Sequence, residues 1–381
     1  MTQQPILAVT MGYPFGIGGE VFLKSWLVLQ QQPSPPLLLL IDDPIRVKQL
    51  IAFLDLAITI APSVPHPMPL TRDQLMGWLS QHRHQLVVLP PQTTMAAKAN
   101  NPLPAVAFHI GPPTSMTQKI AGGMASLAAI DTAVDLAQKK IIDAVITAPI
   151  DKSAIAATMV GFTGHTEYLK ERDHQQQVVM MMAHQPVANH PSTAAEKKNN
   201  ANQQPTPFRT VPLTTHIALQ DVAKKLTAPL IETSCRLVAR SLQQQFAIAK
   251  PRLAMAALNP HAGEDGTMGR EEIEIITPAI KKLQAEGMDI KGPLPADSLF
   301  TPQHRARFDV FLCPSHDQAL IPIKTLFFDS AVNVTLGLSF IRTSPDHGTA
   351  TDMAPHGAAN PAAMLSAIAL AQQLSLHQPT H

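Results

Sequence analysis

Residues 313–361 read CPSHDQALIPIKTLFFDSAVNVTLGLSFIRTSPDHGTATDMAPHGAANP, and this stretch guides the interpretation of the whole chain. It alternates apolar runs with isolated polar groups, among them His316, Lys324, Asn333 and Arg342. Polar groups within apolar sequence are costly to bury unless they are paired or used for binding. We expect the apolar runs to form buried strands or turns that hold these groups in place. The stretch therefore predicts part of a functional site.

The composition of the chain restricts its class. A chain of 381 residues is long enough for two domains. The 29 basic and 28 acidic residues leave a net charge of +1, which gives no electrostatic footprint for nucleic acid or an anionic membrane. Aromatic residues make up only 4%, which argues against a base-stacking surface. We therefore expect neither nucleic acid nor a membrane as partner.

The cysteines and the N-terminus indicate a cytoplasmic protein. Cys235 and Cys313 form no CxxC pair, and two thiols are too few for a disulfide framework, so a reducing compartment is the simplest interpretation. The opening residues lack the charged region of a signal peptide. No stretch approaches the roughly 18 apolar residues of a membrane span.

Short apolar runs alternate with helical patterns along the chain, which predicts an α/β fold. The predicted strands cover 6–11, 37–42, 85–90, 141–150, 177–183, 252–260 and 309–320. The last of them is expected to end at His316 and Asp317. The clearest predicted helices cover 119–140, which is rich in small residues, and 229–247.

Two segments interrupt this alternation. Residues 91–113 are rich in proline and predict a long surface connection. Residues 184–209 are rich in Asn, Gln, Pro and Ala, and predict a disordered or mobile insertion. His184 and His190 within it are expected to be solvated loop residues.

The first loop contains Gly12, Gly16, Gly18 and Gly19. These glycines do not form GxGxxG, because Val21 stands where the third glycine belongs, so a Rossmann pyrophosphate loop is not expected. The loop is either a tight turn between strand and helix or a segment whose backbone approaches a ligand. The spacing supports both readings equally.

Three histidines share one local pattern. His165, His216 and His316 each follow a strand or turn and stand beside a hydroxyl or carboxylate residue. Neutral imidazoles are good ligands for Zn²⁺ and similar ions. The alternative is three unrelated structural histidines. The chain has 16 histidines, so spacing alone favours that alternative.

Lys324, Asn333 and Arg342 flank apolar runs, and such a set suits a phosphate or carboxylate if it converges in a pocket. Rim charges on a sheet edge are the alternative. Residues 346–352, DHGTATD, combine an acid, an imidazole, glycine and hydroxyls. They form either a cofactor loop at a helix start or a simple turn.

A resemblance to a known family narrows these alternatives. Segments in the family's order include VTMGYPFGIGGE, VITAPIDK, GFTGHTEYL, TTHIALQDV, LNPHAGEDGTMGREE, GPLPADSLF, SHDQALIPIK, VNVTLGLSFIRTSPDHGTATDMA and ANPAAMLSAI. They span nearly the whole chain, and the LNPHAGE, LPAD and FIRTSPDHGTA blocks are the most specific. The sequence resembles the 4-hydroxythreonine-4-phosphate dehydrogenase family of vitamin B6 biosynthesis, which is related more distantly to isopropylmalate and isocitrate dehydrogenases.

The resemblance implies a two-domain α/β/α fold like that of isopropylmalate dehydrogenase. It implies a discontinuous cofactor-side domain, residues 1–120 with 336–381. Residues 121–335 would form a metal, substrate and dimerisation domain. The protein would be a homodimer with active sites at the interface.

The resemblance also assigns roles to residues. It implies a divalent metal, zinc, magnesium or cobalt, bound by His165, His216 and His316 with ligands drawn from both subunits. The positions that match substrate-binding residues are Thr147, Lys324, Asn333 and Arg342. The positions that match acidic catalytic residues are Asp297 and Asp317. The positions that match a loop for NAD or NADP are His347, Gly348, Asp352 and Asn360.

The activity implied is oxidation of 4-phosphonooxy-L-threonine to a β-keto acid that decarboxylates to 3-amino-2-oxopropyl phosphate. Two alternatives stay open. One is a related dehydrogenase for a phosphorylated sugar acid such as threonate or erythronate phosphate. The other is a non-catalytic ligand-binding relative.

The chain departs from the family pattern chiefly in its first loop. Tyr13 replaces an aspartate, Phe15 an alanine and Gly19 a proline, so a carboxylate is lost and two bulky rings are added. Asp151 replaces an asparagine and Ala319 a glycine. Ile146 stands where some members have a substrate-contacting histidine, so that contact is not carried over.

Overall fold

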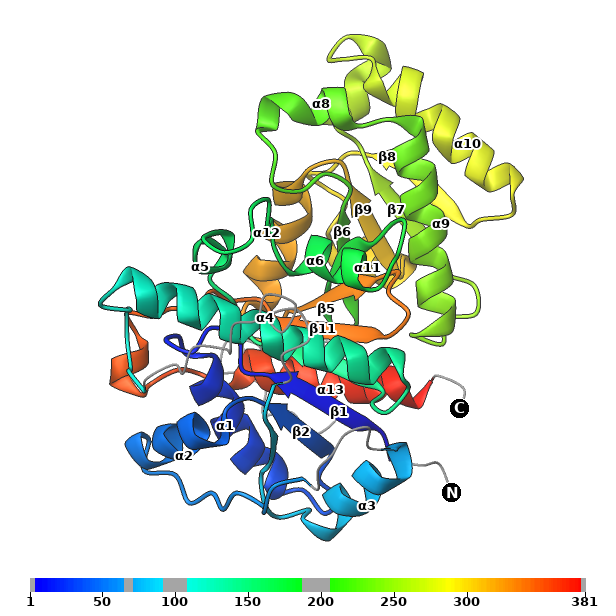
Figure 1. Ribbon diagram of the computed structural model, residues 1–381. Coiled ribbons are helices and arrows are strands. Elements are labelled where there is room, and N and C mark those ends of the chain that lie inside the picture. Colours follow the sequence, from blue (N-terminus) through cyan, green and yellow to red (C-terminus); the bar gives the residue numbers. More distant parts are fainter. Residues whose placement is uncertain (1–3, 65–70, 92–107, 187–205, 378–381) are drawn as a thin grey trace. The chain divides into compact units, whose positions relative to one another are not determined.

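The computed structural model describes residues 4–64, 71–91, 108–186 and 206–377. The chain divides into two compact units, unit 1 formed by Met1–Gln176 with Leu338–His381, and unit 2 formed by Gln177–Gly337. Each unit contains strands that pair into sheet and helices that pack beside them (Figure 1). The predicted α/β class is therefore confirmed.

Unit 1 is built on parallel strands in the order β3-β2-β1-β4-β11. The strands are β1 (Ile6–Thr10), β2 (Leu37–Ile41), β3 (Val87–Leu89), β4 (Ala144–Thr147) and β11 (Ile341–Pro345). All five are buried along their full length, which is why they appear in the sequence as continuous apolar runs.

Helices connect and cover these strands. They are α1 (Gly18–Gln30), α2 (Pro44–Phe53), α3 (Arg72–Gln81), α4 (Met116–Gln138), α5 (Lys152–Ala156), α6 (His165–Arg172) and α13 (Ala362–Leu376). Side chains fix several of their starts: Asp43 accepts the amide hydrogen of Ile45 at α2, and Thr71 forms a capping box with Gln74 at α3.

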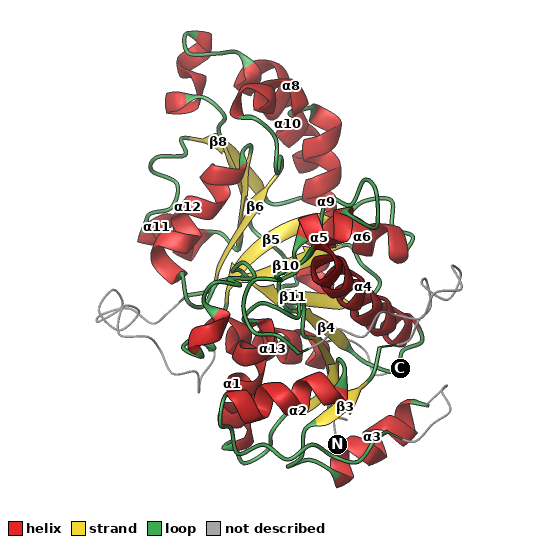
Figure 2. Cartoon of the chain, turned by 60° about the vertical axis from the view of Figure 1, so that its left-hand side comes forward, coloured by secondary structure: helices red, strands yellow, loops and turns green. Residues whose placement is uncertain are grey.

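The long helix α4 contacts β1 and β4, and α13 contacts the same strands and β11. Figures 1 and 2 show α4 on one face of the sheet and α13 on the other. By length and composition α4 is apolar enough to cross a membrane, but 72% of its most apolar window is buried within the protein. It is a core helix, and its small residues explain the close packing.

Unit 2 has strands in the order β10-β5-β6-β9-β7-β8, of which β5 is antiparallel to both neighbours and the pairs from β6 to β8 are parallel. The strands are β5 (Val179–His184), β6 (Phe208–Pro212), β7 (Leu253–Ala256), β8 (Ile290–Leu294), β9 (Val310–Cys313) and β10 (Val332–Leu336). The α-helices in the described part of unit 2 are α8 (Val222–Lys225), α9 (Ala228–Gln244), α10 (Thr277–Ala285), α11 (Pro302–Arg307) and α12 (His316–Phe327), and a π-helix lies at Glu272–Ile276.

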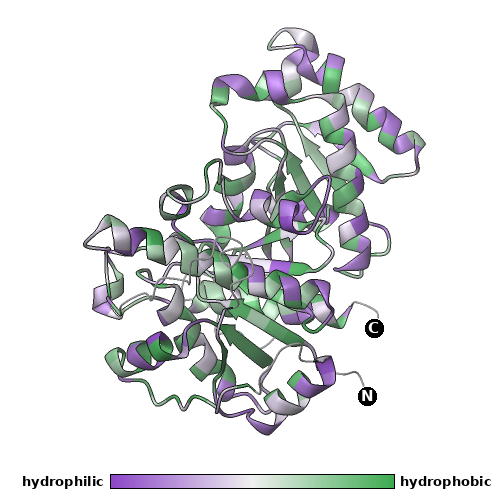
Figure 3. Cartoon of the chain, viewed as in Figure 1, coloured by the Kyte–Doolittle hydropathy of each residue, from purple (hydrophilic) through white to green (hydrophobic). Residues whose placement is uncertain are grey.

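The core of unit 2 lies between this sheet and its helices. The rings of Phe208 and Phe311 meet edge to face with centroids 5.4 Å apart, and Phe327 of α12 joins the same buried cluster. Figure 3 shows the hydrophobic residues concentrated on the strands of both units.

The structure corrects two local predictions. The predicted strand 309–320 ends at Cys313, because Ser315 donates its backbone N–H to Gln318 and starts α12. Leu326 and Phe327 of the LFF run lie in this helix and Phe328 is its C-cap residue, so the run forms no strand. In the segment 289–300, Asp297 lies in a turn, and the strand before it, β8, was not predicted from the sequence.

The predicted insertion 184–209 is shorter at both ends than expected. His184 closes β5 and Phe208 opens β6, and both side chains are buried. Residues 187–205 lie outside the described part of the chain. The same holds for residues 92–107 of the predicted proline-rich connection.

The boundary between the units differs from the domain boundary implied by the resemblance. Residues 121–176 belong to unit 1 because β4 pairs with both β1 and β11, and α4 packs on β1 and β4. The cofactor and substrate roles of the two domains stay predictions.

Candidate active site

A buried cation stands beside a buried hydroxyl in unit 1. Arg342 of β11 donates from Nε and Nη2 to Oγ1 of Thr147 at the end of β4, over 3.2 and 2.7 Å. Neither side chain is more than 2% exposed. Burial lowers the pKa of Arg342 to about 10, so the guanidinium still carries its charge at neutral pH. Two predicted substrate residues are thus brought together.

His165 is the first residue of α6, after the N-cap residue Gly164. Its Nε2 atom is buried and has no hydrogen-bond partner among the described residues. Burial, with the positive charges of Arg342 and Lys152, holds the pKa of His165 well below its ordinary value. The imidazole is therefore neutral, and its nitrogen lone pair is available to a ligand.

Asp151 and Lys152 lie where α5 begins, and Lys152 is near the backbone that precedes His165. Asp151 caps α5 by accepting the amide hydrogens of Ser153 and Ala154, over 2.8 and 3.0 Å. Lys152 passes close to Gly164, since a Cβ atom built there would lie 3.1 Å from its Cε. This lysine therefore places a second positive charge near His165.

The aromatic residues of the first loop form a small buried cluster. The rings of Tyr13 and Phe15 meet edge to face with centroids 5.3 Å apart, and both side chains are 1% exposed. They press on α4 at Gly122, where an added Cβ would lie 2.7 Å from the Tyr13 ring. Burial, followed by the charge of Asp151, raises the pKa of Tyr13 above its ordinary value. The phenol therefore stays neutral and does not replace the lost carboxylate.

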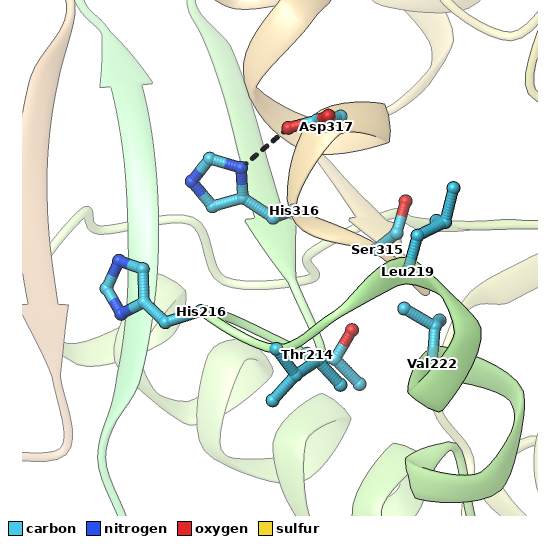
Figure 4. A pocket seen from close by; sticks show the side chains of 8 residues that line it. Thr214, His216, Leu219, Val222, Ser315, His316 and Asp317 are labelled. Atoms are coloured by element: carbon cyan, nitrogen blue, oxygen red, sulfur yellow. Dashed lines mark hydrogen bonds and ion pairs between the residues drawn. The ribbon is translucent and has the colours of Figure 1, made fainter.

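In unit 2, His216 and His316 line one cavity of about 210 Å³, together with Thr214, Leu219 and Asp317. Their ring centroids are 6.0 Å apart. Figure 4 shows both rings projecting to the same side of the site. Nδ1 of His316 lies 2.8 Å from Oδ1 of Asp317, which fixes the ring and leaves Nε2 for another partner.

Hydrogen bonds to neighbouring loops place these two histidines. Thr214 donates from Oγ1 to the carbonyl oxygen of Pro314 over 2.7 Å, which joins the loop after β6 to the end of β9. Gln318 donates to the carbonyl oxygen of Ala257 over 3.0 Å, which holds the start of α12. His216 itself adopts a left-handed backbone conformation with φ of 53°.

The other predicted site residues of unit 2, Lys324, Asn333 and Asp297, lie on three different elements. Lys324 lies on α12, two turns after His316. Asn333 lies on β10, and its Oδ1 is buried without a hydrogen-bond partner among the described residues. Asp297 is exposed in the turn after β8. Asp297 is not among the described residues that line the cavity with His216 and His316.

The predicted cofactor loop runs between β11 and α13. Nδ1 of His347 lies 2.9 Å from the carbonyl oxygen of Gly348, and its Nε2 has no hydrogen-bond partner within the described ranges. Asn360 accepts the amide hydrogen of Ala362 over 3.0 Å at the start of α13. Asp352 is exposed on the loop.

Comparison with known proteins places the chain in a family. The sequence model described as "Pyridoxal phosphate biosynthetic protein PdxA" matches residues 73–371. The chain belongs to the PdxA family. A relative from Methylorubrum populi named 4-hydroxythreonine-4-phosphate dehydrogenase is 40% identical over 379 residues, which is 97% of this chain and 94% of the relative.

Solved structures agree with this placement in the PdxA family. A 4-hydroxythreonine-4-phosphate dehydrogenase from Klebsiella pneumoniae superposes with a TM-score of 0.73 at 29% identity, covering 98% of this chain and all of that one. A terephthalate 1,2-cis-dihydrodiol dehydrogenase from Burkholderia xenovorans superposes with a TM-score of 0.58 at 25% identity, covering 97% and 98%. The resemblance seen in the sequence is thus confirmed.

The PdxA family in general implies a divalent metal, and the three predicted ligands are chemically suited to one. His165 has a neutral imidazole with a buried, unpaired Nε2, and His316 has one nitrogen oriented by Asp317. His165 belongs to unit 1, whereas His216 and His316 belong to unit 2. Within the described residues no group of three or more His, Cys, Asp or Glu side chains is gathered for a metal. The ligand set therefore remains a prediction.

A buried hydrogen-bond network between α6 and α4 was not predicted from the sequence. Asp131 of α4 accepts hydrogen bonds from Tyr168 Oη over 2.6 Å and from Arg172 Nε over 2.8 Å. Asp131 is 2% exposed, and burial raises the pKa of its carboxyl group. The network ties α6, which begins at His165, to the core helix. The spacing of Tyr168 and Arg172 at i and i+4 was the available signal.

Proposed function

We propose that this protein is an NAD- or NADP-dependent, metal-dependent 4-hydroxythreonine-4-phosphate dehydrogenase of pyridoxal 5′-phosphate biosynthesis. It oxidises 4-phosphonooxy-L-threonine to a β-keto acid that loses CO₂ to give 3-amino-2-oxopropyl phosphate. Similarity over nearly the full length to relatives with that name supports the substrate class. The buried Arg342–Thr147 pair is the structural observation that carries the proposal.

The phosphate group of the substrate requires a cation that stays charged when water is excluded. Arg342 meets this requirement, because its pKa of about 10 keeps it protonated at neutral pH. Its bonds to Thr147 orient the guanidinium. Lys324 and Asn333 are the further phosphate-binding residues of the proposal. Binding the phosphate at a distance from the reacting carbon contributes to rate when it positions that carbon.

In the oxidation the C–H hydride of the secondary alcohol moves to the nicotinamide ring, and the hydroxyl proton leaves to a base. Asp317 and Asp297 are the proposed acid–base residues. Asp317 also orients His316 through its Nδ1 contact. In the product β-keto acid, the bond from the α-carbon to the carboxylate then breaks and releases CO₂, its electron pair passes toward the new ketone to give an enolate, and the α-carbon takes up a proton to complete 3-amino-2-oxopropyl phosphate.

His165, His216 and His316 would hold the divalent ion, zinc, magnesium or cobalt. Such an ion supplies Lewis-acid polarisation of substrate oxygen atoms. The low pKa of His165 keeps that imidazole neutral for the role. We also propose a cytoplasmic homodimer whose active sites lie at the interface, as the resemblance implies.

Steady-state NADH formation with three substrates tests the proposal. We expect turnover with 4-phosphonooxy-L-threonine and a much lower kcat/KM with threonate 4-phosphate and erythronate 4-phosphate. Preference for a sugar-acid phosphate would assign the protein to the alternative dehydrogenase. No turnover with any of the three, in protein that retains metal, would identify a non-catalytic relative.

A further inference from the structure

Residues 346–361, which contain the predicted cofactor segment 346–352 and Asn360, are held at two separate places, at the N-cap of α1 and on α1 itself. At the first, the backbone N–H of Ile17 donates to the carbonyl oxygen of Thr349 over 2.9 Å. The two backbones approach so closely that a Cβ atom at Gly16 would lie 2.4 Å from that same oxygen. The first glycine loop therefore supports the cofactor loop directly.

The second contact is an ion pair on α1. Lys24 Nζ lies 2.6 Å from Glu20 Oε1, with the Glu20 side chain 3% exposed and that of Lys24 25% exposed. The same Glu20 oxygen accepts the backbone N–H of Ala359 over 2.7 Å. Lys24 Nζ also donates to the carbonyl oxygens of Gly357 over 2.8 Å and Ala359 over 3.2 Å. Glu20 and Lys24 together are called the α1 clamp.

The α1 clamp fixes the loop backbone and is independent of the loop's side chains. It satisfies one amide and two carbonyl groups with charge-assisted bonds, which are about twice as strong as neutral ones. Ser25 of α1 also lies near the loop, with Oγ 3.3 Å from the carbonyl oxygen of Pro361, but its hydroxyl has a shorter acceptor in the carbonyl oxygen of Val21 at 2.7 Å. Because α1 is a regular helix packed on α13, it is a rigid support for this loop.

The loop segment that the clamp holds ends at a predicted cofactor residue. Ala359 directly precedes Asn360, and the two anchored regions, at Thr349 and at 357–361, enclose Asp352. Without the clamp, the backbone on either side of Asn360 would lose these hydrogen bonds and sample more conformations. Ligand binding would then have to restrict those conformations, at a cost in conformational entropy. Such ordering reduces affinity without altering the chemistry at the reacting carbon.

We propose that Glu20 and Lys24 are positioning residues that hold the loop 346–361 in its dinucleotide-binding conformation. This inference rests on the proposed function in one respect, that the loop binds NAD or NADP. The clamp residues act through the loop backbone and are not catalytic residues.

Lys24→Met tests the proposal, because it keeps the methylene stem and removes the charge and the donors. We expect the Kd for NADH, measured by fluorescence titration, and the KM for NAD each to rise about tenfold, equivalent to roughly 1.4 kcal/mol. The kcat and the KM for 4-phosphonooxy-L-threonine should stay within about twofold of wild type. Hydrogen exchange at the Ala359 amide should become faster.

Two further variants keep the test specific. Lys24→Arg retains a cation with several donors and should restore NADH affinity to within about threefold of wild type. Lys139→Met removes an exposed lysine from the end of α4 and should change neither NADH affinity nor exchange in the loop. If Lys24→Met does not fold, Glu20→Gln takes its place: it keeps an oxygen acceptor for the Ala359 amide but removes the negative charge that pairs with Lys24, so a smaller rise in the Kd for NADH is expected, and an unchanged Kd would overturn the proposal.

The proposal is overturned if Lys24→Met binds NADH as tightly as the wild type. It is also overturned if kcat and both KM values worsen together, since that pattern indicates general structural damage. A wild type that binds NADH without turning over the phosphorylated substrate refutes the proposed function alone, and the clamp is then judged on NADH affinity. A wild type that binds neither NADH nor NADPH refutes both.

Discussion

Replacing Arg342 by methionine should separate activity from stability. Arg342 is 2% exposed, and its lowered pKa of about 10 corresponds to roughly 3 kcal/mol that burial costs the charged form. Methionine fills a similar volume and removes that cost. It also removes both hydrogen bonds to Thr147, each contributing about 1 kcal/mol. The free energy of unfolding should therefore change by less than about 2 kcal/mol.

The same substitution should greatly reduce catalysis. In the proposed complex Arg342 forms a buried charge pair with the substrate phosphate. Removing the arginine from this pair should cost about 3 kcal/mol of transition-state stabilisation, which lowers kcat/KM roughly 150-fold. The assay is NADH formation with 4-phosphonooxy-L-threonine, alongside thermal unfolding of the same preparation. The Tm should move by no more than about 8 °C, since 1 kcal/mol shifts a unit of this size by about 2–4 °C.

Arg209→Met is the matched control. Arg209 is also buried, with a pKa lowered to about 10 by burial, but it stacks on Phe246 in unit 2 and has no proposed role in the site. Its substitution should leave kcat/KM within about twofold of wild type. A kcat/KM for Arg342→Met within about threefold of wild type would refute the phosphate assignment. Equal losses in both arginine variants would show that the effect is not specific.

Three further outcomes are expected. His216→Ala should lower the bound metal, measured by elemental analysis, and an unchanged stoichiometry would show that the ligand set is misassigned. Tyr168→Phe should lower the free energy of unfolding by about 1–3 kcal/mol in urea titrations, because buried Asp131 loses a hydrogen-bond donor. Asp309→Asn should destabilise the protein most near neutral pH. Burial alone would raise the pKa of Asp309, but its hydrogen bonds from Arg252 lower it overall, so its stabilisation is present above the ordinary value of 3.8 and is lost as pH falls through the lowered folded-state pKa.

Each of these outcomes has its own control. His84→Ala removes an exposed histidine of unit 1 and should leave the metal content unchanged. A Tyr168→Phe variant as stable as wild type would show that Arg172 alone satisfies the Asp131 carboxylate. A difference between wild type and Asp309→Asn that stays constant from pH 7 to well below pH 4 would contradict the assigned pKa shift.

The elements that the sequence predicted well are those whose burial is continuous. β1, β2 and β4 are buried on both faces, so their apolar runs were visible without any structure. The helix α4 was visible through its small residues. β8 was not, because its sequence IKGPL is only partly buried and contains both glycine and proline.

The sequence named individual candidate residues of the site, but it did not predict which of them lie close together in space. His216, His316 and Asp317 do line one cavity, and Arg342 does meet Thr147. Local sequence rules cannot place the boundary between the units, since that depends on β4 pairing with strands far apart in the chain.

The supporting contacts were the least visible part of the site. Glu20 and Lys24 appear in the sequence as an ordinary surface pair at i and i+4, yet the Glu20 side chain is buried beneath a loop more than 300 residues away. Asp131 likewise lies in an apolar helix and gains its partners only when α6 packs beside it. Such contacts depend on tertiary packing, which no local pattern records.

The most direct test of the proposed activity is the stoichiometry of the reaction with 4-phosphonooxy-L-threonine in the presence of NAD and a divalent ion. We predict that NADH and CO₂ are released in equal amounts and that 4-hydroxythreonine without the phosphate reacts far more slowly. Absence of NADH, or equal rates with and without the phosphate, would contradict the proposed function.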